Sequence, residues 1–405
     1  MKQLLAYCLS IILCVSFTGC MENYLDLYPE DKITSASFPE NESDIKLLLN
    51  GVYAQLREKE VYNQGLFGFG ITDGATPNAF NWGTDEVFNK LGAGRLSSSD
   101  GGVVTYRWKR CYEIISRANY LLACMDLVDL SEEAKAKYSG ETHFLRGLAY
   151  SVLAETYGGV PIILTNISTE EARSLKRASL EETWQQALDD YEVAITNLGV
   201  DAPEPGRATK GAALGMKMRA YLYQGKYKEV LACVEQIDAL KKYGLFHSYE
   251  GLFDPANENN KEVLFDIQYI EGENSQGSYI DQYCGTGTGS WTRGSRYVPT
   301  DDLVAAYETI DGSPVDPENP YENRDPRLGF TAVLPGSYFL GYRFPNYLYP
   351  GGAFNHAGNR LKHLSTRKYR IQDESKLPPS GQSYINDIIL RYADVLLSKA
   401  EAIIE

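Results

Sequence analysis

The sequence predicts a mainly α-helical fold in which helices pack as antiparallel pairs and long loops carry much of the remaining surface. Apolar residues recur at three- and four-residue spacing over most of residues 104–243, which is the period of an amphipathic helix. Helix-start and helix-stop signals separate these periodic segments at short intervals. Residues 61–103 and 244–383 instead lack a long helical period and are rich in Gly, Asn and aromatic residues. The chain of 405 residues is 43 % hydrophobic, which suffices for one large core.

Residues 1–19 have the pattern of a signal peptide that precedes a lipid-modified cysteine. Lys2 supplies the positive start, an apolar stretch runs from Leu4 to Phe17, and S-F-T-G-C closes the segment. The stretch is too short to span a membrane as a helix. Cleavage before Cys20 would leave a lipidated N-terminus, which anchors a protein at a membrane surface. An ordinary secretory signal is the alternative.

The body of the chain begins with a polar tether over residues 20–41 and a first helix over residues 42–57. The helix places its apolar residues on one face: Ile45, Leu48, Leu49, Val52 and Leu56. Residues 61–103 break the helical pattern. Loops of this length in a folded domain are usually functional or disordered, and the aromatic residues argue against disorder. We therefore expect an ordered surface excursion that carries Asp73, Asn78, Asn81 and Trp82.

Helical periodicity resumes near Tyr106 and indicates a first pair of long helices. Ser131 is the predicted N-cap of the second helix, because acidic residues follow it in the first turn. That helix should stop near Tyr157, since Gly158 can adopt a left-handed conformation and Pro161 lacks a backbone donor.

A second set of paired helices follows. Ser179 and Glu182 form a capping-box pattern at the start of one helix. After a Pro- and Gly-containing loop, two helices are predicted at about residues 209–224 and 226–241. Gly225 separates them in the sequence YQGKY, which is typical of the joint between the two helices of a tetratricopeptide-like pair.

The last part of the chain contains fewer regular elements. We expect a strand with its lead-in over residues 260–269, a short helix within 298–312, and a final helix over 386–405. Residues 42–405 are thus predicted to form a single domain. Its helical core is expected in residues 42–60, 104–243 and 384–405, and its ligand-facing loops in residues 61–103 and 244–383.

The segment FLRGLAYSVLAETYGGVP, residues 144–161, resembles the signature of the SusD/RagB family, in which an arginine-bearing helix ends in an aromatic residue, two glycines and a proline. Other resemblances occur in the family's order: RATKGAA, LVAAYETIDG, RDPRL, RKY and RYADVLLSKAEA. The resemblance implies a SusD-like, tetratricopeptide-type core with this helix in its middle. The family normally continues beyond the position of Glu405, so we expect a truncated C-terminus.

The resemblance also implies a function. SusD-like proteins are outer-membrane lipoproteins that capture nutrients, mostly glycans, and pass them to a SusC-like TonB-dependent transporter. This implies a surface-facing protein that is lipid-anchored in the outer membrane and has a glycan ligand and a transporter partner. Three alternatives remain: a tetratricopeptide-type scaffold that binds protein, a peptide-binding member of the same family, and a secreted glycoside hydrolase.

Composition and motifs favour binding over catalysis. The net charge of −15 and the pI near 4.9 argue against a nucleic-acid partner. The four histidines are scattered, and the glycine-rich stretch at 285–289 lacks the lysine of a phosphate loop. We therefore predict no enzyme, no cofactor and no metal site. A Ca²⁺ site is a less favoured alternative, with oxygen ligands from Asp254, Asn257 and Glu258.

Two loop stretches combine aromatic rings with polar side chains, as carbohydrate sites do. Rings stack on the apolar faces of sugars, while polar groups bond the hydroxyls. The first stretch offers Asp73, Asn81 and Trp82, and the second offers Tyr283, Trp291, Arg293 and Tyr297. No motif transfers the family's ligand residues directly, so this is a regional prediction. For each Trp, burial under its own loop is the alternative.

Overall fold

The computed structural model describes residues 38–57, 73–81, 90–97, 99–272, 277–278, 280, 297–343, 364–378 and 382–405. The predicted signal peptide, the predicted lipidation site Cys20 and most of the tether lie outside these residues. None of the helices among the described residues combines the length and apolar character that crossing a membrane requires.

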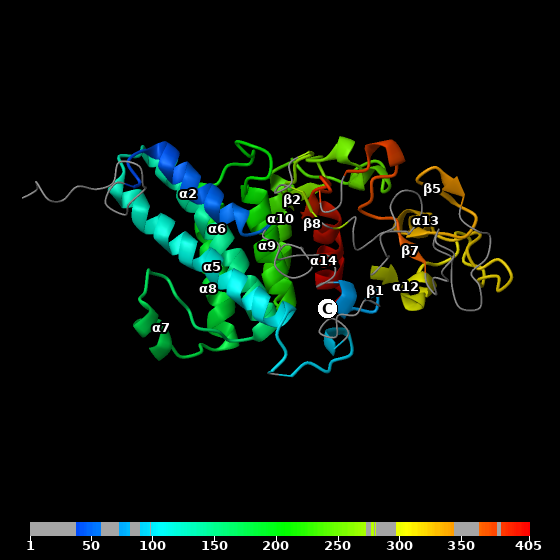
Figure 1. The fold of residues 1–405 in the computed structure, drawn as a ribbon, viewed down its shortest axis with the longest axis horizontal. Helices are drawn as coiled ribbons and strands as arrows, with labels where there is room; N and C mark the ends of the chain where they lie inside the picture. Colours follow the sequence, from blue (N-terminus) through cyan, green and yellow to red (C-terminus); the bar gives the residue numbers. More distant parts are fainter. Residues whose placement is uncertain are drawn as a thin grey trace, which may run out of the picture.

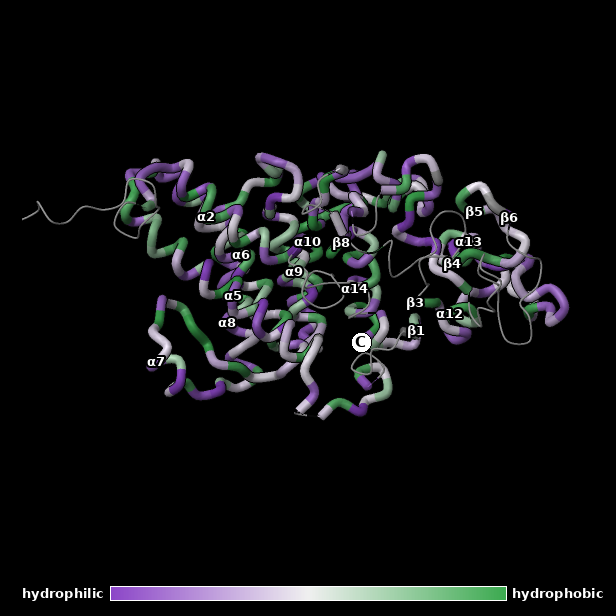
Figure 2. Tube along the Cα trace, viewed as in Figure 1, coloured by the Kyte–Doolittle hydropathy of each residue, from purple (hydrophilic) through white to green (hydrophobic). Residues whose placement is uncertain are grey.

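Seven long helices of the described residues form the body of the molecule. They are α2 (Glu42–Ala54), α5 (Val103–Cys124), α6 (Glu132–Tyr157), α8 (Leu180–Asn197), α9 (Lys210–Tyr223), α10 (Tyr227–Ala239) and α14 (Tyr392–Ile404). Helices α5 to α10 pack in chain order, each long helix against the next, while α2 lies against α5 and α6 and α14 against α10 and α9. Figure 1 shows these helices side by side, and Figure 2 shows hydrophobic and hydrophilic stretches alternating along them. The predicted fold class is confirmed.

Helix α6 lies at the centre of this core and buries residues on all sides of its C-terminal half. Arg146 is 6 % exposed and donates through Nε and Nη2 to Asp190 on α8, with an Nη2–Oδ1 distance of 2.7 Å. Its Nη1 donates to Asn119 Oδ1 on α5 at 2.8 Å. A Cβ on Gly147 would lie 3.1 Å from the Ala187 carbonyl oxygen, so glycine lets α6 and α8 approach closely. The signature helix is therefore a structural hub.

Local capping explains most of the helix boundaries. The Ser131 side chain accepts from the Ala134 amide, and Ser179 with Glu182 forms the predicted capping box. Helix α6 ends at Tyr157, where Gly158 has φ +76°, and Gly225 has φ +66° between α9 and α10. These predicted boundaries are confirmed.

The short helix α7 (Thr169–Ser174) was not predicted. It has a capping box of its own, formed by Ser168 and Glu171. That Ser-x-x-Glu spacing is the signal that could have found it.

The prediction of a single final helix over residues 386–405 is wrong in its first part. Residues Asp387–Arg391 form strand β8, and α14 starts only at Tyr392. Strand β8 pairs antiparallel with β2 (Val263–Ile267), which lies within the predicted strand over 260–269. The run of apolar residues in β8 fits both a strand and a helix, and pairing with β2 decides between them because it buries Leu390 and satisfies the backbone.

Short elements make up the remaining loop-rich part, which lies beyond α14 in Figure 1. Three two-stranded sheets pair β1 (Ala79–Asn81) with β3 (Tyr297–Pro299), β4 (Ala332–Val333) with β7 (Ser365–Thr366), and β5 (Tyr338–Phe339) with β6 (Tyr342–Arg343). The short helices of this part are α12 (Asp301–Ala306) and α13 (Arg327–Thr331), and the 3₁₀ turns among its described residues are η1 (Asp73–Ala75), η3 (Gly251–Phe253), η4 (Pro255–Asn257) and η5 (Glu374–Lys376). A further 3₁₀ turn, η2 (Met125–Leu127), directly follows α5. The helix predicted within residues 298–312 is α12, and the side chain of Thr300 caps its N-terminus by accepting from the Leu303 amide.

Candidate ligand-binding site

The pairing of β1 with β3 joins the two loop stretches that the sequence predicts for ligand binding. Asn81 on β1 lies opposite Tyr297 on β3, with Ala79 opposite Pro299. Asp73 opens η1, just before β1. The first loop and the end of the second therefore meet at one place, although they lie far apart in the chain. The other predicted ligand residues, Trp82, Tyr283, Trp291 and Arg293, lie outside the described residues, and their role stays a prediction.

A cavity of about 200 Å³ lies beside this strand pair. Residues of η1, β1, β3, α12, α13 and β7 contribute to its wall, as do side chains between these elements. Its polar groups come from Asp73, Asn78, Thr331, Thr366 and Lys368, and its aromatic rings from Tyr249 and Tyr307. The cavity thus offers charged, hydroxyl and aromatic groups within one small space, which is the mixture expected of a carbohydrate site.

Hydrogen bonds between distant segments hold the wall of the cavity in place. The Thr300 amide donates to the Asn78 carbonyl oxygen at 3.1 Å, and the Thr300 hydroxyl accepts from the Leu303 amide at the start of α12. The Tyr307 and Thr331 hydroxyls lie 2.8 Å apart. Buried Arg324, in the motif RDPRL, donates to several backbone carbonyls, including that of Tyr307 at 3.0 Å. This motif therefore acts by positioning the backbone that carries the site.

Lys368 lies among aromatic rings at the cavity. Its ammonium is 4.5 Å from the ring centroid of Phe253 and 5.3 Å from that of Tyr369, distances typical of cation–π contacts. The rings of Phe253 and Tyr369 are 4.8 Å apart, and Tyr249 packs edge-on against Phe253 at 5.4 Å. Burial lowers the pKa of Lys368, an effect that nearby Tyr249 opposes.

Asp73 brings the opposite charge to the same cavity. Burial raises the pKa of its carboxyl, while Lys368 and a hydrogen bond with the Asn78 side chain oppose that rise. The predicted residue Asp73 is thus placed at the cavity together with Lys368, Tyr249 and Tyr307, which the sequence analysis did not select as site residues. Lys368 belongs to the RKY motif. The combination of basic and aromatic residues in that motif was the signal that could have identified Lys368 as a site residue.

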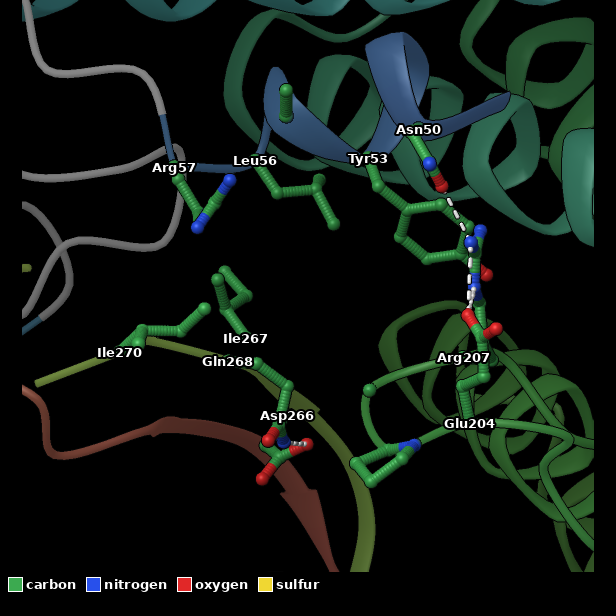
Figure 3. A pocket seen from close by; sticks show the side chains of 13 residues that line it. Asn50, Tyr53, Leu56, Arg57, Glu204, Arg207, Asp266, Ile267, Gln268 and Ile270 are labelled. Carbon is green, nitrogen blue, oxygen red and sulfur yellow. Dashed lines mark hydrogen bonds and ion pairs between the residues drawn. The ribbon is translucent and has the colours of Figure 1, made fainter. Parts of the chain in front are cut away.

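Two larger cavities, of about 400 and 430 Å³, are both lined in part by the loop that includes Glu204 and Arg207. Figure 3 shows the first, with Tyr53 of α2 close to Arg207 and with Asp266 of β2 on its wall. Tyr53 donates to Glu141 at 2.8 Å and accepts from the Ala208 amide, and Arg207 lies over its ring at 4.9 Å. These groups bond one another and fix the RATKGAA segment to α2. We therefore assign them a structural role.

The three residues of the calcium alternative use their side chains for hydrogen bonds with backbone groups. Asp254 accepts from the Ala256 amide, the Asn257 side chain donates to the Gly251 carbonyl, and Glu258 accepts from the Asn386 amide. Among the residues that the structure describes, no cluster of three or more His, Cys, Asp or Glu side chains could hold a metal ion. Nothing in this geometry favours calcium.

Family models match most of the chain in two consecutive parts. Residues 23–222 match a model described as starch-binding and associating with the outer membrane, and residues 261–405 match the model of the SusD family. The chain belongs to the SusD/RagB family. In this family the structural neighbours share the helical, tetratricopeptide-like core seen here.

Curated SusD-like proteins are related to the chain at moderate identity. SusD-like protein P25 of Formosa agariphila is 26 % identical over 321 residues, which is 74 % of this chain and 58 % of that protein. A SusD-like protein of Bacteroides ovatus is 24 % identical over 418 residues, which is 95 % of this chain and 69 % of the relative. The chain thus spans a little over half the length of the first relative.

Solved SusD-like structures superpose over nearly the whole chain. A SusD-like carbohydrate-binding protein of Bacteroides fragilis matches with a TM-score of 0.79 and 27 % identity, covering 90 % of this chain and 74 % of the other. A laminarin-binding SusD-like protein matches with a TM-score of 0.68 and 21 % identity, covering 90 % and 80 %. The second likeness supports the fold alone.

Proposed function

We propose that this chain is a cell-surface lipoprotein that binds nutrient glycans, as oligo- or polysaccharides, and delivers them to a SusC-like TonB-dependent transporter in the outer membrane. The observation that carries the proposal is the cavity beside β1 and β3. It combines Asp73, Lys368 and two tyrosines in a chain of the SusD/RagB family. Relatives with the same fold include proteins named for carbohydrate, laminarin and surface-glycan binding.

The chemistry of the cavity suits sugars. Tyrosine rings cover the apolar C–H face of a pyranose, and their hydroxyls bond at the rim. The charged groups of Asp73 and Lys368 supply stronger hydrogen bonds to sugar hydroxyls than neutral partners do, and the neutral amide of Asn78 adds an ordinary donor and acceptor. Binding through these groups requires no covalent bond to be made or broken.

We infer capture without catalysis. Glycoside hydrolysis usually needs two carboxyl groups that flank the scissile bond. Among the described residues that line the cavity, Asp73 is the single carboxylate. A lipid anchor at Cys20 would hold such a capture protein beside a transporter in the membrane.

Calorimetric titration of the Cys20→Ala protein against plant, host and microbial glycans tests this function. Micromolar to millimolar binding without release of new reducing ends is the expected result. Release of reducing ends would indicate a hydrolase. If folded protein binds no glycan and instead binds peptides, the peptide alternative replaces the proposal.

The predicted aromatic residues give a second test. Trp82→Ala or Trp291→Ala should weaken glycan binding while the melting temperature stays near that of the wild type, because a stacking ring contributes to the ligand and not to the core. Calorimetry with the glycan found above measures the first effect, and thermal denaturation the second. A fall in melting temperature that matches the loss of affinity would identify the ring as a core residue.

A further inference from the structure

Lys368 and Asp73 line one cavity with opposite charges that do not pair directly. Neither side chain forms an ion pair within 4.0 Å among the described residues. Lys368 interacts with Tyr249, Phe253 and Tyr369, and Asp73 interacts with Asn78. An ammonium carries three donors, so the hydrogen bond with Tyr249 leaves others available. The two groups are close enough for each to influence the pKa of the other, and both line the cavity.

We propose that Lys368 and Asp73 together recognise two adjacent hydroxyls of a single neutral sugar ring. This inference rests on the glycan-binding function proposed above and specifies its substrate class. An ammonium only donates hydrogen bonds and an ionised carboxylate only accepts them, whereas a hydroxyl does both. A ring with neighbouring hydroxyls therefore satisfies both side chains at once: one hydroxyl accepts from Lys368, and the next donates to Asp73.

The charges disfavour acidic and basic sugars. With both side chains ionised, Lys368 and Asp73 contribute no net charge to the cavity. A uronate carboxylate can approach Lys368 only within the small cavity that Asp73 also lines, and an amino-sugar ammonium can approach Asp73 only within the cavity that Lys368 also lines. Like charges in a partly desolvated site repel strongly, because the local dielectric is low. The pair therefore selects a neutral ring.

The size of the cavity limits how much of a glycan enters it. Its volume of about 200 Å³ is below the roughly 300–1,000 Å³ of pockets that enclose drug-sized ligands. One sugar ring fits such a space better than several consecutive rings. Tyr249 and Tyr307 lie on its wall and can contact the apolar face of that ring. We therefore assign the cavity to a terminal or branching residue of a neutral glycan.

The test compares three proteins with small probes of defined chemistry. Wild type, Asp73→Asn and Lys368→Met are studied by saturation-transfer NMR with the methyl glycosides of glucose, galactose, mannose and xylose, and with methyl glucuronide. Wild type should bind at least one neutral glycoside more tightly than methyl glucuronide. Each substitution should weaken that binding roughly tenfold, since Lys368→Met removes a charged hydrogen-bond donor and Asp73→Asn replaces a charged acceptor by a neutral one.

One response distinguishes recognition by charge from general damage. Asp73→Asn should weaken binding of the neutral glycoside and improve the relative affinity for methyl glucuronide, because the repelling carboxylate is gone. A deoxy analogue of the preferred glycoside, lacking one of the two hydroxyls, should bind wild type and Asp73→Asn with similar affinity if the missing hydroxyl is the one that donates to Asp73.

Matched controls keep the test decisive. Asp302→Asn changes an exposed aspartate on α12 that does not line the cavity, and Lys228→Met changes an exposed lysine on α10. Both should leave affinity unchanged. Lys368→Met removes an ammonium from an aromatic environment. Where this substitution lowers the melting temperature, the role of the charges in binding is judged from Lys368→Arg, which keeps the charge, and from Asp73→Asn, whose position lies in a turn.

Different outcomes overturn different claims. Glycans that bind wild type and both variants equally, or methyl glucuronide that binds best, would refute the assignment and leave the proposed function standing. A wild-type protein that binds none of the polysaccharides of the earlier panel would refute the glycan function and this inference with it.

Discussion

Arg146 in the helical core and Lys368 in the loop-rich part are both cations with little access to water, but their partners differ. Arg146 meets Asp190 and Asn119 directly, at 2.7 and 2.8 Å, and its charge is matched inside the protein. Lys368 meets aromatic rings, while the carboxylate of Asp73, which lines the same cavity, lies beyond ion-pair distance. The first arrangement joins three helices, whereas the second leaves hydrogen-bonding capacity for a ligand.

This comparison separates two uses of charge within one chain. A matched buried pair contributes to stability chiefly because losing one partner leaves the other charge uncompensated. An unmatched pair around a cavity contributes little to folding, and under the proposal above its remaining hydrogen bonds form with a ligand. Substitutions at charged groups that differ in burial therefore test whether matched buried pairs contribute more to stability than the others.

The largest expected effect is at the core pair. Arg146→Met should lower the free energy of unfolding by about 3–5 kcal/mol, because Asp190 would remain buried without a cation. Chemical denaturation of the variant and the wild type measures the loss. The double variant with Asp190→Leu should recover part of it. A loss below about 1 kcal/mol would mean that the pair is dispensable and that the comparison with Lys368 fails.

Three carboxyl groups on or next to strands β2 and β8 should have an effect of intermediate size on stability. Burial raises the pKa of Asp387 and of Glu258 to about 7 and that of Asp266 to about 6. A folded-state pKa above the unfolded value means that the folded protein binds the proton more tightly. The stability from these groups is present below about pH 4 and is lost as pH rises to about 7.

Melting temperatures between pH 5 and pH 8 test this prediction. The wild type should melt at a lower temperature as the pH rises through this range, and Asp387→Asn should show a smaller decrease, since it removes one titrating group. Asp302→Asn, an exposed control, should follow the wild type. Identical pH profiles for wild type and Asp387→Asn would show that Asp387 does not titrate in this range.

The smallest expected effect concerns an exposed ion pair. Lys135 and Asp126 lie 3.1 Å apart, and their side chains are 39 % and 80 % exposed. Asp126→Asn should change the free energy of unfolding by less than about 1 kcal/mol, because water and salt screen such pairs. Denaturant titration at low and high salt measures it. A loss comparable to that of Arg146→Met would show that exposure does not determine how much these ion pairs contribute to the free energy of unfolding.

Much of the helical core follows from local sequence. The cap at Ser131, the capping box of Ser179 and Glu182, and the glycines at 158 and 225 act within a few residues of themselves. Such interactions are readable without a structure. The order of the family motifs likewise indicated the SusD/RagB fold. The capping box at Ser168 was equally local and was missed because helix α7 is short.

The candidate site was predictable only as a region. Loop composition pointed to Asp73, Asn81 and Tyr297, but nothing in the sequence showed that Asn81 and Tyr297 face one another on paired strands. Lys368 was visible only as part of a family motif. Its position among Phe253, Tyr249 and Tyr369 depends on segments distant in sequence, which no local pattern encodes.

By itself the sequence therefore determined most of the long helices, several of their ends and the family, because caps, glycines and apolar periodicity act over one or two turns. The tertiary structure alone decided that residues 387–391 form a strand, that two loops meet at β1 and β3, and that Lys368 and Asp73 line one cavity. The physical reason is that strand pairing and cavity walls need partners distant in sequence. Their energies arise only once the chain has brought those partners together.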